Sequence, residues 1–168
     1  FPELSSLLAA ERAPTVADVH RALTFKLRRW RGDPKQATIA LSWLAKRRCS
    51  SLAMQVLHCM EEARVEINVI HCNTVVNACA KAEHWQLALK LLADMTQLRV
   101  LPDVVTCNAA ISACGKGDHW PTALALLDSM PQRRVVPNVI TCNAAVSACE
   151  KGASWQHALA ILACMPAL

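Results

Sequence analysis

The chain has 168 residues, of which 54% are hydrophobic and 18% are charged, and its formal net charge is +5. This size and apolar content suffice for one domain with a full core and exclude a disordered chain. Four Gly, two Phe and no Tyr argue against a β-sandwich or barrel, and the longest apolar run, residues 158–168, is too short for a membrane-spanning helix.

Residue types recur every 35 positions along the chain. The period predicts four repeats over residues 34–68, 69–103, 104–138 and 139–168, the last one truncated. Residues 1–33 keep the same register and are predicted to form a degenerate N-terminal capping repeat. The ladders that set the register are Cys72, Cys107 and Cys142; Cys79, Cys114 and Cys149; Met60, Met95, Met130 and Met165; Leu57, Leu92, Leu127 and Leu162; Lys46, Lys81, Lys116 and Lys151; and Arg29, Arg64, Arg99 and Arg134.

The sequence pattern within each repeat predicts two helices joined by a short turn. The first helix follows a capping Asn68, Asp103 or Asn138 and ends near residues 81–83, 116–118 or 151–153, where Gly117 and Gly152 suit a C-cap. The second begins at Trp85, Trp120 or Trp155 and is ended by Pro131 or Pro166. This pattern predicts an all-α fold, a right-handed α-solenoid of helix-turn-helix hairpins in which the leucine and methionine ladders are buried.

One face of each first helix carries a mostly polar stripe, and stacked helices should align these stripes into a groove edged by lysines. Asn73, Asn108 and Asn143 recur on this face although Asn is a mediocre helix former. Either an inter-repeat hydrogen bond or a ligand would explain them. The stripes are Lys35, Thr38, Ser42 and Lys46; Ile70, Asn73, Asn77 and Lys81; Val105, Asn108, Ser112 and Lys116; and Ile140, Asn143, Ser147 and Lys151.

The cysteines of the two ladders lie on the opposite face, among Val and Ile, so we expect them to be reduced and buried. No Cys-x-x-Cys motif or Cys/His pair has the spacing of a zinc finger, and we expect no metal site and no cofactor. The tryptophans at the start of each second helix are interpreted as packing residues between repeats, rather than as stacking platforms for bases.

Two segments carry a family resemblance. Residues 105–117 (VTCNAAISACGKG) and 140–152 (ITCNAAVSACEKG), each followed by Ala-Leu pairs and a Met, resemble the pentatricopeptide repeat (PPR). Cys72, Cys107 and Cys142 stand where the family usually has an aromatic residue, as in the Cys-rich variants common in dinoflagellate algae. The resemblance implies an organellar protein, in a chloroplast or mitochondrion after removal of a targeting segment, that binds single-stranded RNA and reads one base per repeat with two side chains.

The resemblance also implies a set of RNA-binding residues and a weak adenine-uracil-pyrimidine-pyrimidine preference. Lys35 replaces the usual aliphatic residue of the first repeat. The implied base-reading residues are Thr38 with Asn68, Asn73 with Asp103, Asn108 with Asn138, and Asn143 alone. The residues implied to sandwich bases are Ile70, Val105 and Ile140, and those implied to face phosphates are Lys46, Lys81, Lys116 and Lys151.

The charge distribution supports a second hypothesis. Residues 1–68 carry 11 basic and 7 acidic side chains, whereas residues 69–168 carry 7 and 6, so the best-matching repeats are nearly neutral. With a mean hydropathy of +0.23, the array could instead be a structural subunit that binds neighbouring proteins of an organellar ribosome, photosystem or respiratory complex. The basic run of Lys26, Arg28, Arg29 and Arg31 suits RNA or an acidic protein face equally.

An enzyme is the third class, and the sequence argues against it. It has no His-x-Glu and Pro-Cys-x-x-Cys pair of a zinc deaminase and no Gly-rich phosphate loop. We therefore predict a non-catalytic protein with no small-molecule substrate.

Overall fold

A computed structural model describes residues 1–9 and 12–164, and the regular secondary structure in this part of the chain is helical, without a strand. The predicted all-α fold is therefore confirmed. No described helix is long and apolar enough to cross a membrane. The helices are α1 (Pro2–Leu8), α2 (Val16–Trp30), α3 (Lys35–Lys46), α4 (Ser50–Glu62), α5 (Val69–Ala82), α6 (Trp85–Asp94), α7 (Val104–Lys116), α8 (Trp120–Ser129), the short 3₁₀ helix η1 (Pro131–Arg133), α9 (Val139–Lys151) and α10 (Trp155–Cys164).

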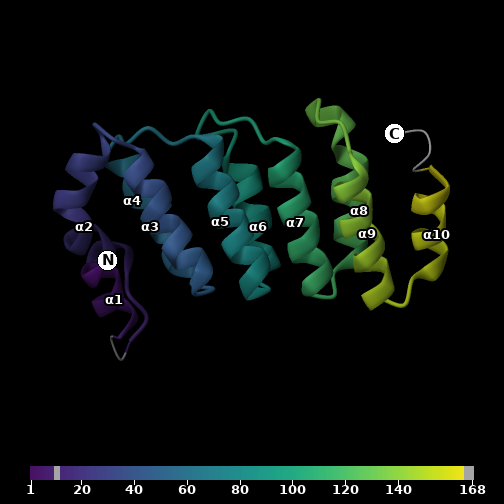
Figure 1. Cartoon of the computed structure of the whole chain (residues 1–168), viewed down its shortest axis with the longest axis horizontal. Helices are drawn as coiled ribbons and strands as arrows, with labels where there is room; N and C mark the ends of the chain where they lie inside the picture. Colours follow the sequence, from purple (N-terminus) through teal and green to yellow (C-terminus); the bar gives the residue numbers. More distant parts are fainter. Residues whose placement is uncertain (10–11, 165–168) are drawn as a thin grey trace.

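The helical pairs follow one another in a row from α2 at one end to α10 at the other (Figure 1). The first helices of the four repeats, α3, α5, α7 and α9, pack directly against one another, and each second helix packs on the first helix of its own repeat. The second helices α4, α6 and α8 also pack on the first helix of the next repeat. This connectivity is a solenoid of helical hairpins, as the 35-residue period predicts. The division into repeats stays a prediction, but each of the four intervals contains one such pair of helices.

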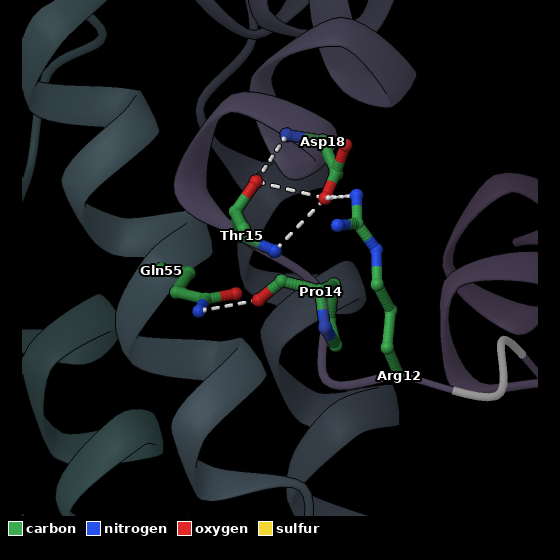
Figure 2. Close-up of polar contacts among 5 residues, drawn as sticks. All are labelled: Arg12, Pro14, Thr15, Asp18 and Gln55. Atoms are coloured by element: carbon green, nitrogen blue, oxygen red, sulfur yellow. Dashed lines mark hydrogen bonds and ion pairs between the residues drawn. The ribbon is translucent and has the colours of Figure 1, made fainter.

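Residues 1–33 contribute α1 and α2, and α2 packs against α4. The hydroxyl of Thr15 accepts the backbone N–H of Asp18 at the start of α2, and the Asp18 carboxylate accepts that of Thr15 and pairs with Arg12 at 3.2 Å (Figure 2). Gln55 of α4 donates its Nε2–H to the carbonyl of Pro14 at 2.9 Å. Polar contacts therefore hold the start of α2 to the first repeat.

The core follows the predicted ladders except at the C-terminal end. Met60, Met95 and Met130 are buried, whereas Met165 lies outside the described residues. In the leucine ladder, Leu57 and Leu92 are buried and Leu127 is half-buried. Leu162, however, is 46% exposed, and the prediction was wrong there because no described helix follows α10 to cover it.

The six cysteines of the two ladders are buried, as predicted. Burial raises the pKa of Cys72 and Cys114 to about 11 and that of Cys79 to about 12. These thiols are therefore protonated at neutral pH and pack as small apolar side chains between the helices.

Capping boxes begin three of the helices that line the predicted groove. The side chains of Asn68, Asp103 and Asn138 accept backbone N–H groups in the first turns of α5, α7 and α9. The third residue of each helix completes the box, and it is His71 in α5 but Thr106 and Thr141 in α7 and α9. Because the cap fixes where each helix starts, it also fixes the register of the stripe behind it.

The buried His71 makes folding stability depend on pH. Its Nδ1 accepts the N–H of Asn68 at 3.2 Å and its Nε2–H donates to the carbonyl of Pro34 at 3.0 Å, so the neutral ring fills both roles. Burial lowers the pKa of His71 below the ordinary 6.5, although the bond to Pro34 opposes this shift. Below about pH 6.5, His71 therefore binds a proton more readily in the unfolded chain than in the folded one. The free energy of unfolding should decrease as the pH is lowered through this range.

The variant His71→Thr tests this, because Thr is the residue of the next two repeats. We expect it to remove part of the loss in melting temperature between pH 7 and pH 5, while lowering stability at pH 7 by about 1–3 kcal/mol through the lost contact with Pro34. Circular dichroism melts at both pH values measure the effect. An unchanged pH dependence would mean that His71 is not protonated on unfolding.

Gly117 and Gly152 occupy the C-caps of α7 and α9, as predicted, but with ordinary φ values of −89° and −79°. The left-handed conformation falls on the following residues, Asp118 and Ala153. The glycines are required for space instead: a Cβ on Gly117 would collide with the indole of Trp85, and one on Gly152 with the indole of Trp120.

The tryptophans thus pack between repeats, as predicted, where a next repeat exists. The Trp85 ring also stacks on His119 with centroids 3.8 Å apart, and Trp120 lies 5.2 Å from His157. Trp155 differs, since 64% of its surface is exposed at the end of the described array. Packing against the next repeat therefore explains two of the three tryptophans.

Candidate nucleic-acid interface

The stripes of three neighbouring repeats line two hollows that adjoin. The first lies over α5, α7 and α9, and the second lies between α7 and α9. Asn108 and Ile140 line both hollows, so they form one groove across three repeats. The first hollow is lined by Ile70, Asn73, Thr74, Asn77, Val105, Asn108, Ala109 and Ile140, and the second by Asn108, Ser112, Gly115, Lys116, Ile140, Asn143, Ala144, Ser147, Ala148 and Lys151.

Three aliphatic side chains stand open in this polar groove. Ile70 is 57% exposed, Val105 54% and Ile140 65%. They lie on successive first helices, one per repeat, and all three line the first hollow. Their spacing leaves apolar surface between each pair of repeats, which suits the faces of flat apolar groups. In α3 the corresponding residue is the exposed Lys35.

Asn73 of α5 is hydrogen-bonded to Asp103, the residue that caps α7. The Nδ2 of Asn73 donates to both carboxylate oxygens of Asp103, at 3.1 and 3.3 Å, and its Oδ1 accepts the hydroxyl of Thr106. Burial raises the pKa of Asp103, but hydrogen bonds from Thr106 and Asn73 outweigh it, so the pKa is lower than usual. The cap of α7 is therefore an ionised carboxylate whose position is fixed by an amide of the neighbouring helix α5.

The other implied base-reading residues have different surroundings. The Oδ1 of Asn108 is buried and has no hydrogen-bond partner among the described residues, so it can accept a hydrogen bond from a ligand. Asn138 uses its Oδ1 for the N–H and hydroxyl of Thr141, and no bond joins it to Asn108 in the described structure. Asn143 is exposed, and Thr38 is half-buried.

Two residues that shape the groove were not predicted as part of the site. Thr106 was not singled out because its capping role involves only the start of α7, whereas its contact with Asn73 joins α7 to α5. Gly115 was missed because nothing in its own repeat shows that a Cβ there would lie 2.7 Å from the Cβ of Ala148. The missing side chain lets α7 and α9 approach closely at the floor of the second hollow.

The four lysines of the ladder are exposed in the last turns of α3, α5, α7 and α9. They therefore form a row along one edge of the groove, next to the carbonyl ends of the helices, where a positive charge is favoured. Lys116 and Lys151 line the second hollow directly.

The basic run in α2 divides into two kinds of residue. Lys26 pairs with Glu3 at 2.6 Å and lies over the ring of Phe1, while Arg31 donates to the carbonyl of Ala63. Lys26 therefore joins α2 to α1, and Arg31 joins the end of α2 to the end of α4. Arg28 and Arg29 are exposed.

The fold and groove define an α-helical repeat protein of the solenoid type. The family model of the PPR repeat matches residues 67–116 and 102–151. Together these matches cover half of the chain, which therefore belongs to the PPR repeat family. Comparison with curated protein sequences finds no significant match.

Solved structures of the maize pentatricopeptide repeat protein PPR10 share the fold. One superposes with a TM-score of 0.67 at 20% identity and covers 96% of this chain and 26% of PPR10. A structure of PPR10 in complex with an 18-nt psaJ RNA element gives a TM-score of 0.60 at 22% identity, covering 96% and 25%. The chain thus spans about a quarter of the length of PPR10.

Proposed function

We propose that the groove over α5, α7 and α9 binds single-stranded RNA and reads about one base per repeat. The observation that carries this proposal is the recurrence, on three adjoining helices, of an open aliphatic residue and an asparagine that line one groove, with an exposed lysine in the last turn of each helix. PPR10, which has the same fold, has been crystallised with RNA.

Each element of the stripe suits one part of a nucleotide. Ile70, Val105 and Ile140 would lie against base faces, because bases splayed from a single strand are held by stacking. The amides of the asparagines would bond the base edges, and the unpartnered Oδ1 of Asn108 supplies an acceptor for this purpose. The lysines would face the phosphates.

The expected affinity is modest. A well-read base contributes roughly 1–3 kcal/mol, and association itself costs several kcal/mol. Three or four repeats therefore support weak binding that is strongest at low salt. The role is binding rather than catalysis, and by family resemblance the protein would act in a chloroplast or mitochondrion.

Fluorescence anisotropy with a labelled pyrimidine-rich RNA at low salt tests the proposal. We expect saturable binding to the single strand, weaker binding to a duplex of the same sequence, and a steady loss of affinity as salt rises. Absence of binding to any single-stranded RNA at low salt would overturn the proposed function.

The second candidate function, a scaffold in an organellar ribosome, photosystem or respiratory complex, is favoured by one observation. Trp155, Leu159 and Leu162 are 64%, 56% and 46% exposed on α10 and form an apolar surface that no described helix covers. If the array is a scaffold, polar substitutions of these residues should release the chain from its complex, whereas changes to the groove asparagines should not.

A further inference from the structure

The solenoid has two kinds of turn, one after the first helix of a repeat and one after the second helix. Both kinds hold a non-glycine residue in the left-handed conformation. In the connections that follow α4, α6 and α8, Arg64, Arg99 and Arg134 have φ values of 55°, 56° and 59°. The next residue in each case is a buried valine, whose N–H bonds back to the carbonyl of Met60, Met95 or Met130 at 2.9–3.0 Å. This is a Schellman motif, at whose left-handed position glycine is usual.

The turn after each first helix imposes the same backbone conformation but uses varied residues. Arg48, Glu83, Asp118 and Ala153 occupy its left-handed position, with φ between 51° and 63°. The turn geometry alone therefore does not require a cation. Arginine nevertheless stands at all three left-handed positions after the second helices, although a left-handed residue with a Cβ costs roughly 1–2 kcal/mol.

The three arginines lie in the connections that lead into α5, α7 and α9, whereas the lysines lie in the last turns of these helices. The connections that carry them run along the upper edge of the row in Figure 1, where α5, α7 and α9 begin, whereas these helices end at the lower edge. Each arginine precedes the cap of the next first helix, Asn68, Asp103 or Asn138, by four residues.

The arginines are available for a ligand. All three are exposed, and within residues 1–9 and 12–164 none of them forms an ion pair. The implied base-reading residues lie in the first half of each helix, so the arginine edge is nearer to them along the helix than the lysine edge. Asn73, for example, is eight residues from Lys81, or about 12 Å at 1.5 Å per residue.

We propose that Arg64, Arg99 and Arg134 form a second line of phosphate contacts along the edge of the groove where the first helices begin. This inference rests on the proposed function, since the phosphates are those of the RNA strand in the groove. Arginine suits the role because its planar guanidinium binds phosphate oxygens in pairs. Interaction with the carbonyl end of the second helix is the competing explanation.

A glycine variant separates the two explanations. Arg64→Gly, Arg99→Gly and Arg134→Gly together remove three cations but supply the residue that the turn prefers, so the melting temperature should be unchanged or higher. Binding of the pyrimidine-rich RNA should fall about tenfold or more at low salt. The slope of log affinity against log salt should decrease by about 2, because each phosphate contact on a single strand contributes about 0.7.

Two matched variants complete the test. Arg21→Gln together with Lys90→Gln removes two exposed cations away from the groove, neither of them in an ion pair among the described residues, and should leave the salt slope nearly unchanged. Replacing the three arginines by lysine keeps the charge and should retain most of the slope, whatever happens to stability. If the wild type binds RNA but the glycine variant has the same affinity and slope as the Gln control, the inference is wrong. If the wild type binds no RNA, the proposed function itself has failed.

Discussion

Replacing Asn73, Asn108 and Asn143 by alanine should abolish measurable RNA binding while leaving the helical content unchanged. Three lost base contacts at roughly 1–3 kcal/mol each correspond to an affinity loss of at least 100-fold. The fold should survive, because alanine is a better helix former than asparagine, and within the described part of the chain Asn73 is the one of these three with side-chain hydrogen bonds to lose. Anisotropy titrations and far-UV circular dichroism measure the two quantities.

The matched control removes three exposed amides from outside the groove, with Gln86→Ala, Gln97→Ala and Gln156→Ala. Its RNA affinity should stay within about twofold of the wild type, since surface substitutions away from a site have small effects. If the asparagine variant binds RNA as tightly as this control, base reading by the groove amides is excluded.

The variant Gly117→Ala should destabilise the array by about 1–3 kcal/mol, because overpacking forces a shift of rigid groups. The new Cβ would collide with Cδ1 of Trp85 and lie 3.2 Å from its Cγ. The indole cannot easily retreat, since it stacks on His119. A drop of several °C in the melting temperature is the expected result.

Other positions of the chain suggest a second substitution that should restore stability to the Gly117→Ala variant and a control variant that should not lose it. One repeat earlier, Ser50 and Ala82 stand at the positions of Trp85 and Gly117. The double variant Trp85→Ser with Gly117→Ala should therefore lose less stability than the sum of the single changes. Gly32→Ala should be nearly neutral, because its nearest atom, the carbonyl oxygen of Arg29, would be 3.7 Å away. Purely additive losses would disprove the packing explanation.

The fold could be predicted from the sequence because residues with the same structural role, such as helix caps and core residues, recur at the same position of successive repeats. The caps at Asn68, Asp103 and Asn138 and the buried methionine ladder are local signals that repeat every 35 residues. The exposed Leu162 was missed because burial depends on a following helix, and a periodic pattern says nothing of where the stack ends.

The details of the candidate site depend on contacts between repeats, which no single repeat reveals. The sequence predicted an unusual use for Asn73 and left open whether a hydrogen bond or a ligand explained it. The structure shows the hydrogen bond, to Asp103 and Thr106. It also leaves the neighbouring Asn108 acceptor without a partner among the described residues, so one explanation does not serve every repeat.

This arrangement has a consequence for base reading. The carboxylate of Asp103 already caps α7 and accepts the amide of Asn73, so a base at this repeat must share or displace that bond. A base at Asn108 would meet an acceptor, the Oδ1 atom, that has no hydrogen bond to displace among the described residues. The repeats should therefore differ in how much each base contributes to affinity.

A structure of the protein bound to a short pyrimidine-rich RNA tests the central claim most directly. The proposed function predicts density for successive bases between Ile70, Val105 and Ile140, with their edges at the groove asparagines. Density for the RNA on another surface, with the groove between α5, α7 and α9 left without nucleotides, would contradict it.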